Sequence, residues 1–242
     1  AVKLNGQEIE LNGEGENSSR TKLQQGNEYV ADLVYSSKAV TTSSGGQSGL
    51  FITSGLTLID LKEDKTLELV NSSSKGNFTT RVIGEGNLSL SGNMGFGHNG
   101  NDYSGDTSIV DQSNVTLLHD NAFGKEGDLI VGKEVIVDLN GKMQKVDKLE
   151  DGGMIVIGKS EQDRGKLSVD TLDNAVDNNG GLVGQVNLRG GQLTIRNENK
   201  ATSELTGLTG SGLLVLVDGT SKVTGLNNGL KANVEIQENA TV

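Results

Sequence analysis

Apolar residues recur at every second position in short runs along most of the chain. Examples are Leu56/Leu58, Leu67/Leu69, Leu88/Leu90, Val115/Leu117, Leu129/Val131, Val135/Val137/Leu139, Leu193/Ile195, Leu213/Val215/Val217 and Val234/Ile236. A period of two is typical of a β-strand with one buried face. Gly, Asn, Asp and Ser cluster between the runs and favour turns. Helical spacing is nearly absent, and its one candidate, residues 27–38, is short and lacks clear caps. The pattern predicts an all-β chain.

The small number of aromatic residues helps to distinguish among the possible all-β folds. The 242 residues include four Phe, three Tyr and no Trp, whereas Gly occurs 35 times. Sandwiches and up-and-down barrels of this size usually bury several large aromatic rings. Short strands with stacked Leu, Val and Ile are instead typical of a right-handed, single-stranded parallel β-helix (a solenoid), whose coils stack about 4.8 Å apart. At about 20 residues per coil we expect about eleven or twelve coils, with residues 1–242 forming one unit.

One segment departs from the regular pattern. Residues 14–49 are polar, contain few alternating apolar residues, and include Tyr29 and Tyr35. The segment is either an excursion from the rod or a loosely packed coil. An exposed Tyr makes a good contact residue at an interface, so Tyr29 and Tyr35 are the candidate binding residues.

Composition and charge narrow the class of protein. The absence of Cys excludes disulfides, thiolate metal sites and cysteine nucleophiles. A net charge of −11 with only 21 Lys and Arg argues against nucleic acid as a partner. No apolar run approaches the roughly 18 residues of a membrane helix, and the first residues, which begin with Ala1, lack the features of a signal peptide. Residues 234–242 read as an uncapped strand, so we expect a segment of a longer rod.

Residues 84–158 carry a recognisable succession of strands and turns. The matching positions are Asn101, Tyr103, Gly105, Thr107 and Ile109, then Val115 and Leu117, residues 122–124, Leu129 and Val131, residues 137–141, Gln144, Leu149, Gly152 and Gly153. This stretch resembles the passenger-associated transport repeat of Gram-negative type V autotransporters, of the self-associating or adhesin type. It departs from that pattern at Asp106, where the family more often has a small residue, and at residues 111–113, where it usually has a Gly turn.

The resemblance implies a function at the cell surface. Autotransporter passengers are displayed outside the cell, anchored through a C-terminal outer-membrane barrel that this chain lacks or released, and act in virulence, aggregation, biofilm formation and host adhesion. The implied partner is an identical passenger on a neighbouring cell, or a protein or glycan on a host surface. Two alternatives stay open: the stalk of a serine-protease autotransporter, and a glycan-processing β-helix of the tailspike type.

The sequence motifs that resemble catalytic or metal-binding sites each lack part of the pattern that such a site needs. Residues 95–100 match G-x-G-x-x-G without the strand and helix of a dinucleotide site. Residues 97–102 resemble one calcium-binding nonapeptide, a site that needs tandem copies. His98 and His119 have no third ligand at a convincing spacing, and no serine elbow is present. We therefore expect no catalytic residue, no cofactor and no metal, and predict that the chain is not an enzyme.

Overall fold

A computed structural model describes residues 2–4, 7–9, 31–35, 56–61, 63–64, 66–110, 112–160, 162–174 and 184–242. The described strands are β1 (Val2–Leu4), β2 (Gln7–Ile9), β3 (Ala31–Tyr35), β4 (Leu56–Leu61), β5 (Thr66–Phe78), β6 (Arg81–Gly84), β7 (Asn87–Phe96), β8 (Asp102–Tyr103), β9 (Thr107–Ile109), β10 (Asn114–Leu117), β11 (Leu129–Val131), β12 (Ile136–Asp138), β13 (Met143–Asp151), β14 (Met154–Val156), β15 (Lys166–Asn174), β16 (Gln185–Asn187), β17 (Gln192–Ile195), β18 (Thr202–Leu205), β19 (Leu208–Thr209), β20 (Leu213–Leu216), β21 (Thr220–Val223) and β22 (Asn233–Ile236). One 3₁₀ turn, Glu198–Lys200, is the only helix in these ranges, and none of the described helices is long and apolar enough to cross a membrane.

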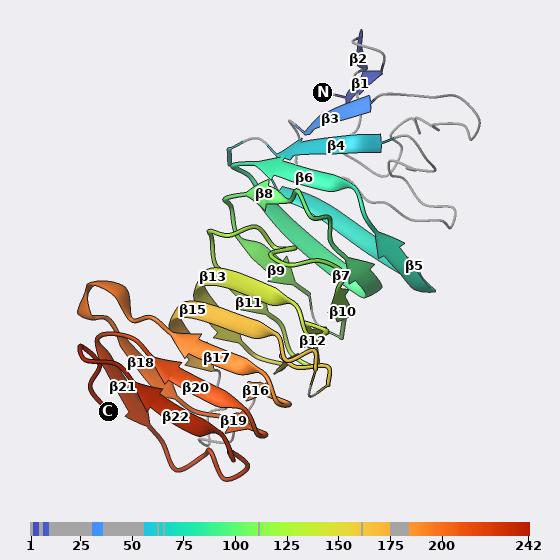
Figure 1. Ribbon diagram of the computed structural model, residues 1–242. Coiled ribbons are helices and arrows are strands. Elements are labelled where there is room, and N and C mark those ends of the chain that lie inside the picture. The colour runs from blue at the N-terminus through green and yellow to red at the C-terminus, as the bar shows by residue number, and fades with distance from the viewer. Residues whose placement is uncertain are drawn as a thin grey trace.

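The strands stack in parallel and form a rod of about 8 turns (Figure 1). The first ladder runs through β5, β7, β9, β11, β13, β15, β18 and β21. The second runs through β7, β10, β12, β14, β16 and β19. The third contains β4, β6 and β8 and, further along, β13, β15, β17, β20 and β22. The predicted all-β parallel β-helix is confirmed.

The structure describes about 8 turns, whereas the sequence pattern predicts about eleven or twelve for all 242 residues, some of which lie outside the described ranges. Hydrogen bonds between successive turns join residues such as Gly92 and Ser113, 21 positions apart, but also Leu172 and Ser203, 31 positions apart. The length of a turn therefore varies along the rod and is not uniformly about 20 residues.

The core consists of columns of inward side chains that repeat from turn to turn. Val135, Val137 and Leu139 are buried as the alternating pattern predicts, and Glu134 between the strands is exposed. Aromatic rings contribute more than expected, because Phe78, Phe96 and Phe123 stack with centroids 5.8 Å apart in each pair. The rings sit one above another, since equivalent positions of successive turns overlie each other.

Side chains at one corner of the rod bind the backbone of the next turn. Asn87 Oδ1 accepts a hydrogen bond from the amide of Asp106 at 2.8 Å. Asp106 Oδ1 accepts from the amide of Asp128 at 2.9 Å, and Asp128 Oδ1 accepts from the amide of Lys148 at 3.0 Å. These bonds satisfy amide groups where the strand ladder is interrupted. Asp106, a departure from the autotransporter pattern, thus serves the stacking of the turns.

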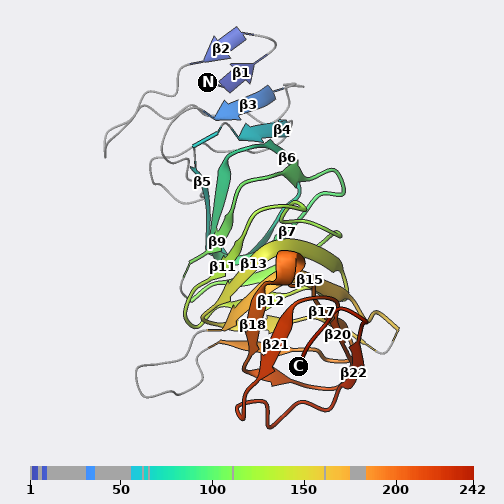
Figure 2. The ribbon, with the colours of Figure 1, turned by 90° about the vertical axis from the view of Figure 1, so that its left-hand side faces the viewer.

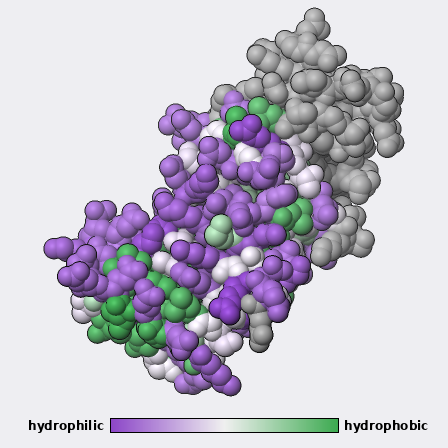
Figure 3. Space-filling model, in the orientation of Figure 1, coloured by the Kyte–Doolittle hydropathy of each residue, from purple (hydrophilic) through white to green (hydrophobic). Residues whose placement is uncertain are grey.

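The two ends of the stack differ. At the N-terminal end β1 pairs antiparallel with both β2 and β3, a change of direction that the sequence pattern did not predict. At the C-terminal end of the stack lies β22 (Figure 2), whose four residues are all exposed. Val234 and Ile236 continue the columns of Leu214 and Leu216, yet are 52% and 54% exposed, because among the described strands β22 pairs with β20 alone. Figure 3 shows an apolar area over this end of the rod.

Candidate interaction surface

The second ladder presents an outward surface with very little charge. Its inward residues, such as Val115 and Val137, alternate with outward ones. Within the described part of the chain, the outward positions on its strands are Asn77, Asn93, Gly95, Asn114, Thr116, Ile136, Asp138, Met154, Gln185, Asn187 and Thr209, whereas Val156, in register with Asp138 and Asn187, is buried. Asp138 is the one charged residue among them, and Arg189 lies 3.9 Å from its carboxylate. We refer to this surface as the amide face.

A groove of about 560 Å³ opens on the amide face. It is lined by Gly76, Asn77, Gly95, Thr116, Leu118 and Asn140. Gly95 keeps the groove open, because a Cβ atom there would lie 2.4 Å from Asn77 Oδ1 and 3.0 Å from the Leu118 side chain. The lining offers amide and hydroxyl groups beside one aliphatic side chain, a chemistry suited to an uncharged polar ligand or to another protein surface.

The rim of the groove is fixed by the turn after β12. Asn140 and Gly141 both have positive φ, 52° and 73°, as expected for a tight Asn-Gly turn. The backbone amide of Asn140 donates to Asp138 Oδ1 at 2.8 Å, and its side-chain amide donates to the carbonyl of Leu117 at 3.3 Å. The Asn140 side chain is therefore held against the preceding turn instead of moving freely in solvent.

Charged side chains gather on the other faces of the rod. Lys148, in the first ladder, lies 2.6 Å from Glu150 and 3.5 Å from Asp173. The pKa of Lys148 is raised, mainly by its hydrogen bond to Glu150. Both pairs are exposed at the surface, where an ion pair contributes little to stability. They neutralise part of the acidic charge of this face.

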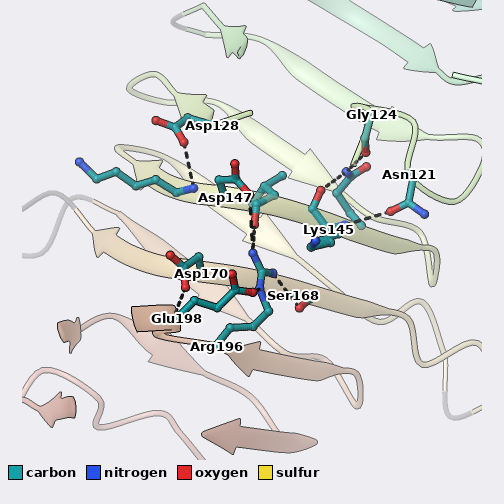
Figure 4. Close-up of polar contacts among 12 residues, drawn as sticks. Asn121, Gly124, Asp128, Lys145, Asp147, Ser168, Asp170, Arg196 and Glu198 are labelled. Atoms are coloured by element: carbon teal, nitrogen blue, oxygen red, sulfur yellow. Dashed lines mark hydrogen bonds and ion pairs between the residues drawn. The ribbon is translucent and has the colours of Figure 1, made fainter. Parts of the chain in front are cut away.

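Arg196 makes polar contacts with side chains and backbone of neighbouring turns (Figure 4). Its Nη1 donates to Ser168 Oγ at 3.0 Å, its Nη2 to the carbonyl of Val146 at 2.9 Å, and its Nε to Glu198 Oε1 at 2.9 Å. The side chain is only 12% exposed and reaches across three turns. Because its donors are occupied within the rod, Arg196 clamps turns together and offers little positive charge to a ligand.

The residues that carry the autotransporter resemblance are mostly structural. Asn101 is buried; its Oδ1 accepts from the amide of Val82 at 2.8 Å, and its Nδ2 donates to the carbonyl of Ala122 at 2.9 Å. Tyr103 is also buried, and its hydroxyl lies 2.6 Å from Thr107 Oγ1. Burial raises the pKa of the Tyr103 phenol, and the hydrogen bond to Thr107 lowers it to a smaller extent. These side chains join turns instead of facing a partner.

Gln144 continues this pattern one turn further on. Its Oε1 accepts from the amide of Phe123 at 3.1 Å, and its Nε2 donates to the carbonyl of Gly124 at 2.8 Å. The chain between β8 and β13 therefore keeps its backbone groups paired through buried side-chain amides where the third ladder has no strand.

The predicted contact tyrosines stay untested. Tyr29 lies outside the described residues. Tyr35 ends β3, but only the backbone of that strand is described. Residues 31–35 thus show that the polar segment 14–49 includes a strand paired with β1 and β4, whereas the rest of that prediction lies outside the described residues.

The histidines and the calcium-like motif have local structural contacts. His98 Nδ1 accepts a hydrogen bond from the amide of Gly100 at 2.9 Å, as in a turn. His119 is exposed. Both polar atoms of the Asn101 amide are used within the fold, so the one nonapeptide-like motif has no free amide oxygen at that position. Among the described residues, no group of three or more His, Asp or Glu is arranged to hold a metal ion.

Comparison with protein-family models, with curated proteins and with solved structures gave no match. The functional argument therefore depends on the surface of the rod itself. Its most distinctive feature is a nearly uncharged face on a chain with a net charge of −11.

Proposed function

We propose that this chain is a β-helical adhesive segment, displayed on a bacterial surface, that associates with a second copy through the amide face. The proposal is supported by the distribution of charge: the outward residues of the second ladder are almost uncharged, whereas Glu150, Asp173 and Glu204 point outward from the first ladder. The resemblance of residues 84–158 to autotransporter passengers of the self-associating type supports the same function.

Electrostatics determines which face two copies can share. Two rods with a net charge of −11 each repel one another over roughly a Debye length, about 8 Å at physiological ionic strength. Contacts between amide faces avoid placing like charges together, which costs several kcal/mol at an interface. Asn and Thr side chains carry both donors and acceptors, so the same face can pair with itself.

The length of the rod converts weak contacts into a stable association. Each outward Asn or Thr contributes a modest hydrogen bond in competition with water. Contacts that repeat over successive turns form together once two rods are aligned, because the first contact raises the effective concentration of the next. Higher salt screens the residual repulsion, so association is expected to strengthen as ionic strength rises.

Sedimentation velocity of the purified chain over a salt series tests this function. In the test variant, Asn93→Asp with Asn114→Asp adds two negative charges to exposed positions of the amide face without changing side-chain size. In the control variant, Asn228→Asp with Asn233→Asp adds the same charge at exposed positions near the C-terminal end. We expect the test variant to weaken association by about tenfold or more, and the control to resemble the wild type.

Three results would contradict the proposal. A folded wild-type chain that stays monomeric at every salt concentration would instead favour the stalk of a larger autotransporter. Equal weakening by both variants would indicate a general charge effect. Loss of association in the control alone would place the contact at the exposed C-terminal end of the stack. Far-ultraviolet circular dichroism of each variant separates these results from misfolding.

A further inference from the structure

Two polar residues interrupt an aliphatic column in the interior of the rod. The column passes through Ile109 and Val131, reaches Asp151 at the end of β13, and continues to Asn174 at the end of β15. Asp151 is 1% exposed and Asn174 is 7% exposed. They are direct partners in the parallel register, so their side chains leave adjacent turns at equivalent positions.

Each of these side chains has one oxygen without a hydrogen-bond partner. Asp151 Oδ1 accepts from the amide of Gly153 at 2.9 Å, and Oδ2 has no partner. The Asn174 side-chain amide donates to the carbonyl of Thr206, and its Oδ1 has no partner. In the described part of the chain, these two are the buried side-chain polar atoms that lack a partner. Buried polar groups are nearly always paired, so two orphan acceptors at adjacent positions call for a shared donor.

We propose that Asp151 is protonated in the folded rod and that its Oδ2–H group donates a hydrogen bond to Asn174 Oδ1 on the next turn. A single proton then satisfies both orphan oxygens. It also removes the charge from the interior, where an unpaired carboxylate is strongly unfavourable. The proton acts as a latch between β13 and β15.

The charged groups of the surrounding strands do not oppose this state. On β13 Lys148 and Glu150 point outward, and Asp173 on β15 lies within 3.5 Å of Lys148 at the same surface. Val131, the neighbour on β11, and Gln185, on β16, carry no charge. Among the described residues, Asp151 is the only Asp, Glu, Lys, Arg or His that is buried. No interior cation is available to stabilise its ionised form.

The latch makes the stability of this part of the rod depend on pH. Burial raises the pKa of Asp151 to about 7, because desolvation outweighs the lowering effect of the hydrogen bond from the backbone amide of Gly153. The folded pKa lies above the ordinary value of 3.8. The folded state therefore binds the proton that the unfolded chain releases, and stability falls as pH rises between these two values. Above the folded pKa the carboxylate is ionised in both states, and the dependence ends.

Urea unfolding of the 242-residue chain at about pH 5.5 and about pH 8.5 tests the latch. The wild type is expected to have the lower unfolding midpoint at the higher pH. Asp151→Asn supplies an amide N–H in place of the acid proton, so this part of the pH dependence should disappear. Asp173→Asn is the control, because Asp173 is exposed and next to Asn174 in the chain. This variant should keep the pH dependence of the wild type. Asn174→Ala should cost more stability at the lower pH, where the latch is closed.

A direct titration completes the test. Carbon NMR of the side-chain carboxyl of Asp151 in the wild-type chain is expected to give a midpoint far above that of an ordinary Asp. An ordinary midpoint would overturn the proposal even if a variant failed to fold. So would identical pH profiles for the wild type and Asp151→Asn. Equal costs of Asn174→Ala at both pH values would show that Asn174 is not the acceptor.

Discussion

Phe96 holds the middle of the aromatic column, and its truncation should be among the most damaging changes in the rod. The side chain has no exposed surface and stacks between Phe78 and Phe123, with centroids 5.8 Å from each. Phe96→Ala removes a buried ring and leaves a cavity, which typically costs about 3–5 kcal/mol. Aromatic contacts add roughly 0.5–1.5 kcal/mol per pair beyond the buried area. We therefore expect a loss of about 4 kcal/mol in the free energy of unfolding.

The measurement for Phe96→Ala is urea unfolding followed by far-ultraviolet circular dichroism, together with amide hydrogen exchange. Because each turn of a solenoid contacts only its neighbours, protection should fall most in β5, β7 and β10. Ile136→Ala is the control: that side chain is 43% exposed on the amide face, and its removal should cost under about 0.5 kcal/mol. A loss below about 1 kcal/mol for Phe96→Ala would refute the reasoning, because it would mean that the column does not hold these turns together.

Two further substitutions test the contacts between turns by the same unfolding measurement. Asn101→Leu leaves the backbone amide of Val82 and the carbonyl of Ala122 without their partners, so the free energy of unfolding should fall by about 2–5 kcal/mol. An unchanged unfolding midpoint would show that these groups find other partners. Gly124→Ala places a Cβ atom 2.2 Å from the carbonyl oxygen of Tyr103 at a φ of 74°, whereas Gly190→Ala, at a φ of 82°, meets no atom within 4 Å. Gly190→Ala should lower the free energy of unfolding only by the roughly 1–2 kcal/mol of left-handed backbone strain, and Gly124→Ala should lower it clearly more. Equal losses for the two variants would contradict the close approach of Gly124 to Tyr103.

Much of the fold follows from local sequence pattern. The alternation of Val135, Val137 and Leu139 predicts a strand with one buried face, and that face is buried. Asn140 and Gly141 predict a tight turn, and both adopt positive φ. Parallel stacking follows from many short aliphatic strands, because a chain with few large rings fills a narrow interior by repeating small columns.

Features that depend on register could not be predicted in the same way. Asn93 and Asn114 lie side by side only because β7 and β10 pair at a particular offset, so the amide face is not visible as a sequence motif. The aromatic column has the same cause, since Phe96 and Phe123 are far apart in the chain. Asp151 looks like one of many surface acids until its place in an interior column is known. Turn length matters here, because it sets which residues of distant segments become neighbours.

Crosslinking through single cysteines tests the central claim, that two copies meet through their amide faces. The chain contains no Cys, so one substitution gives one reactive thiol. Asn114→Cys places it at an exposed position on the amide face, and Asn233→Cys places it at an exposed position on β22. With a short thiol-reactive crosslinker at high salt, we predict covalent dimers of Asn114→Cys and few of Asn233→Cys. More dimer from Asn233→Cys than from Asn114→Cys would contradict association through the amide face. So would equal amounts of dimer from the two variants, which random collision would produce.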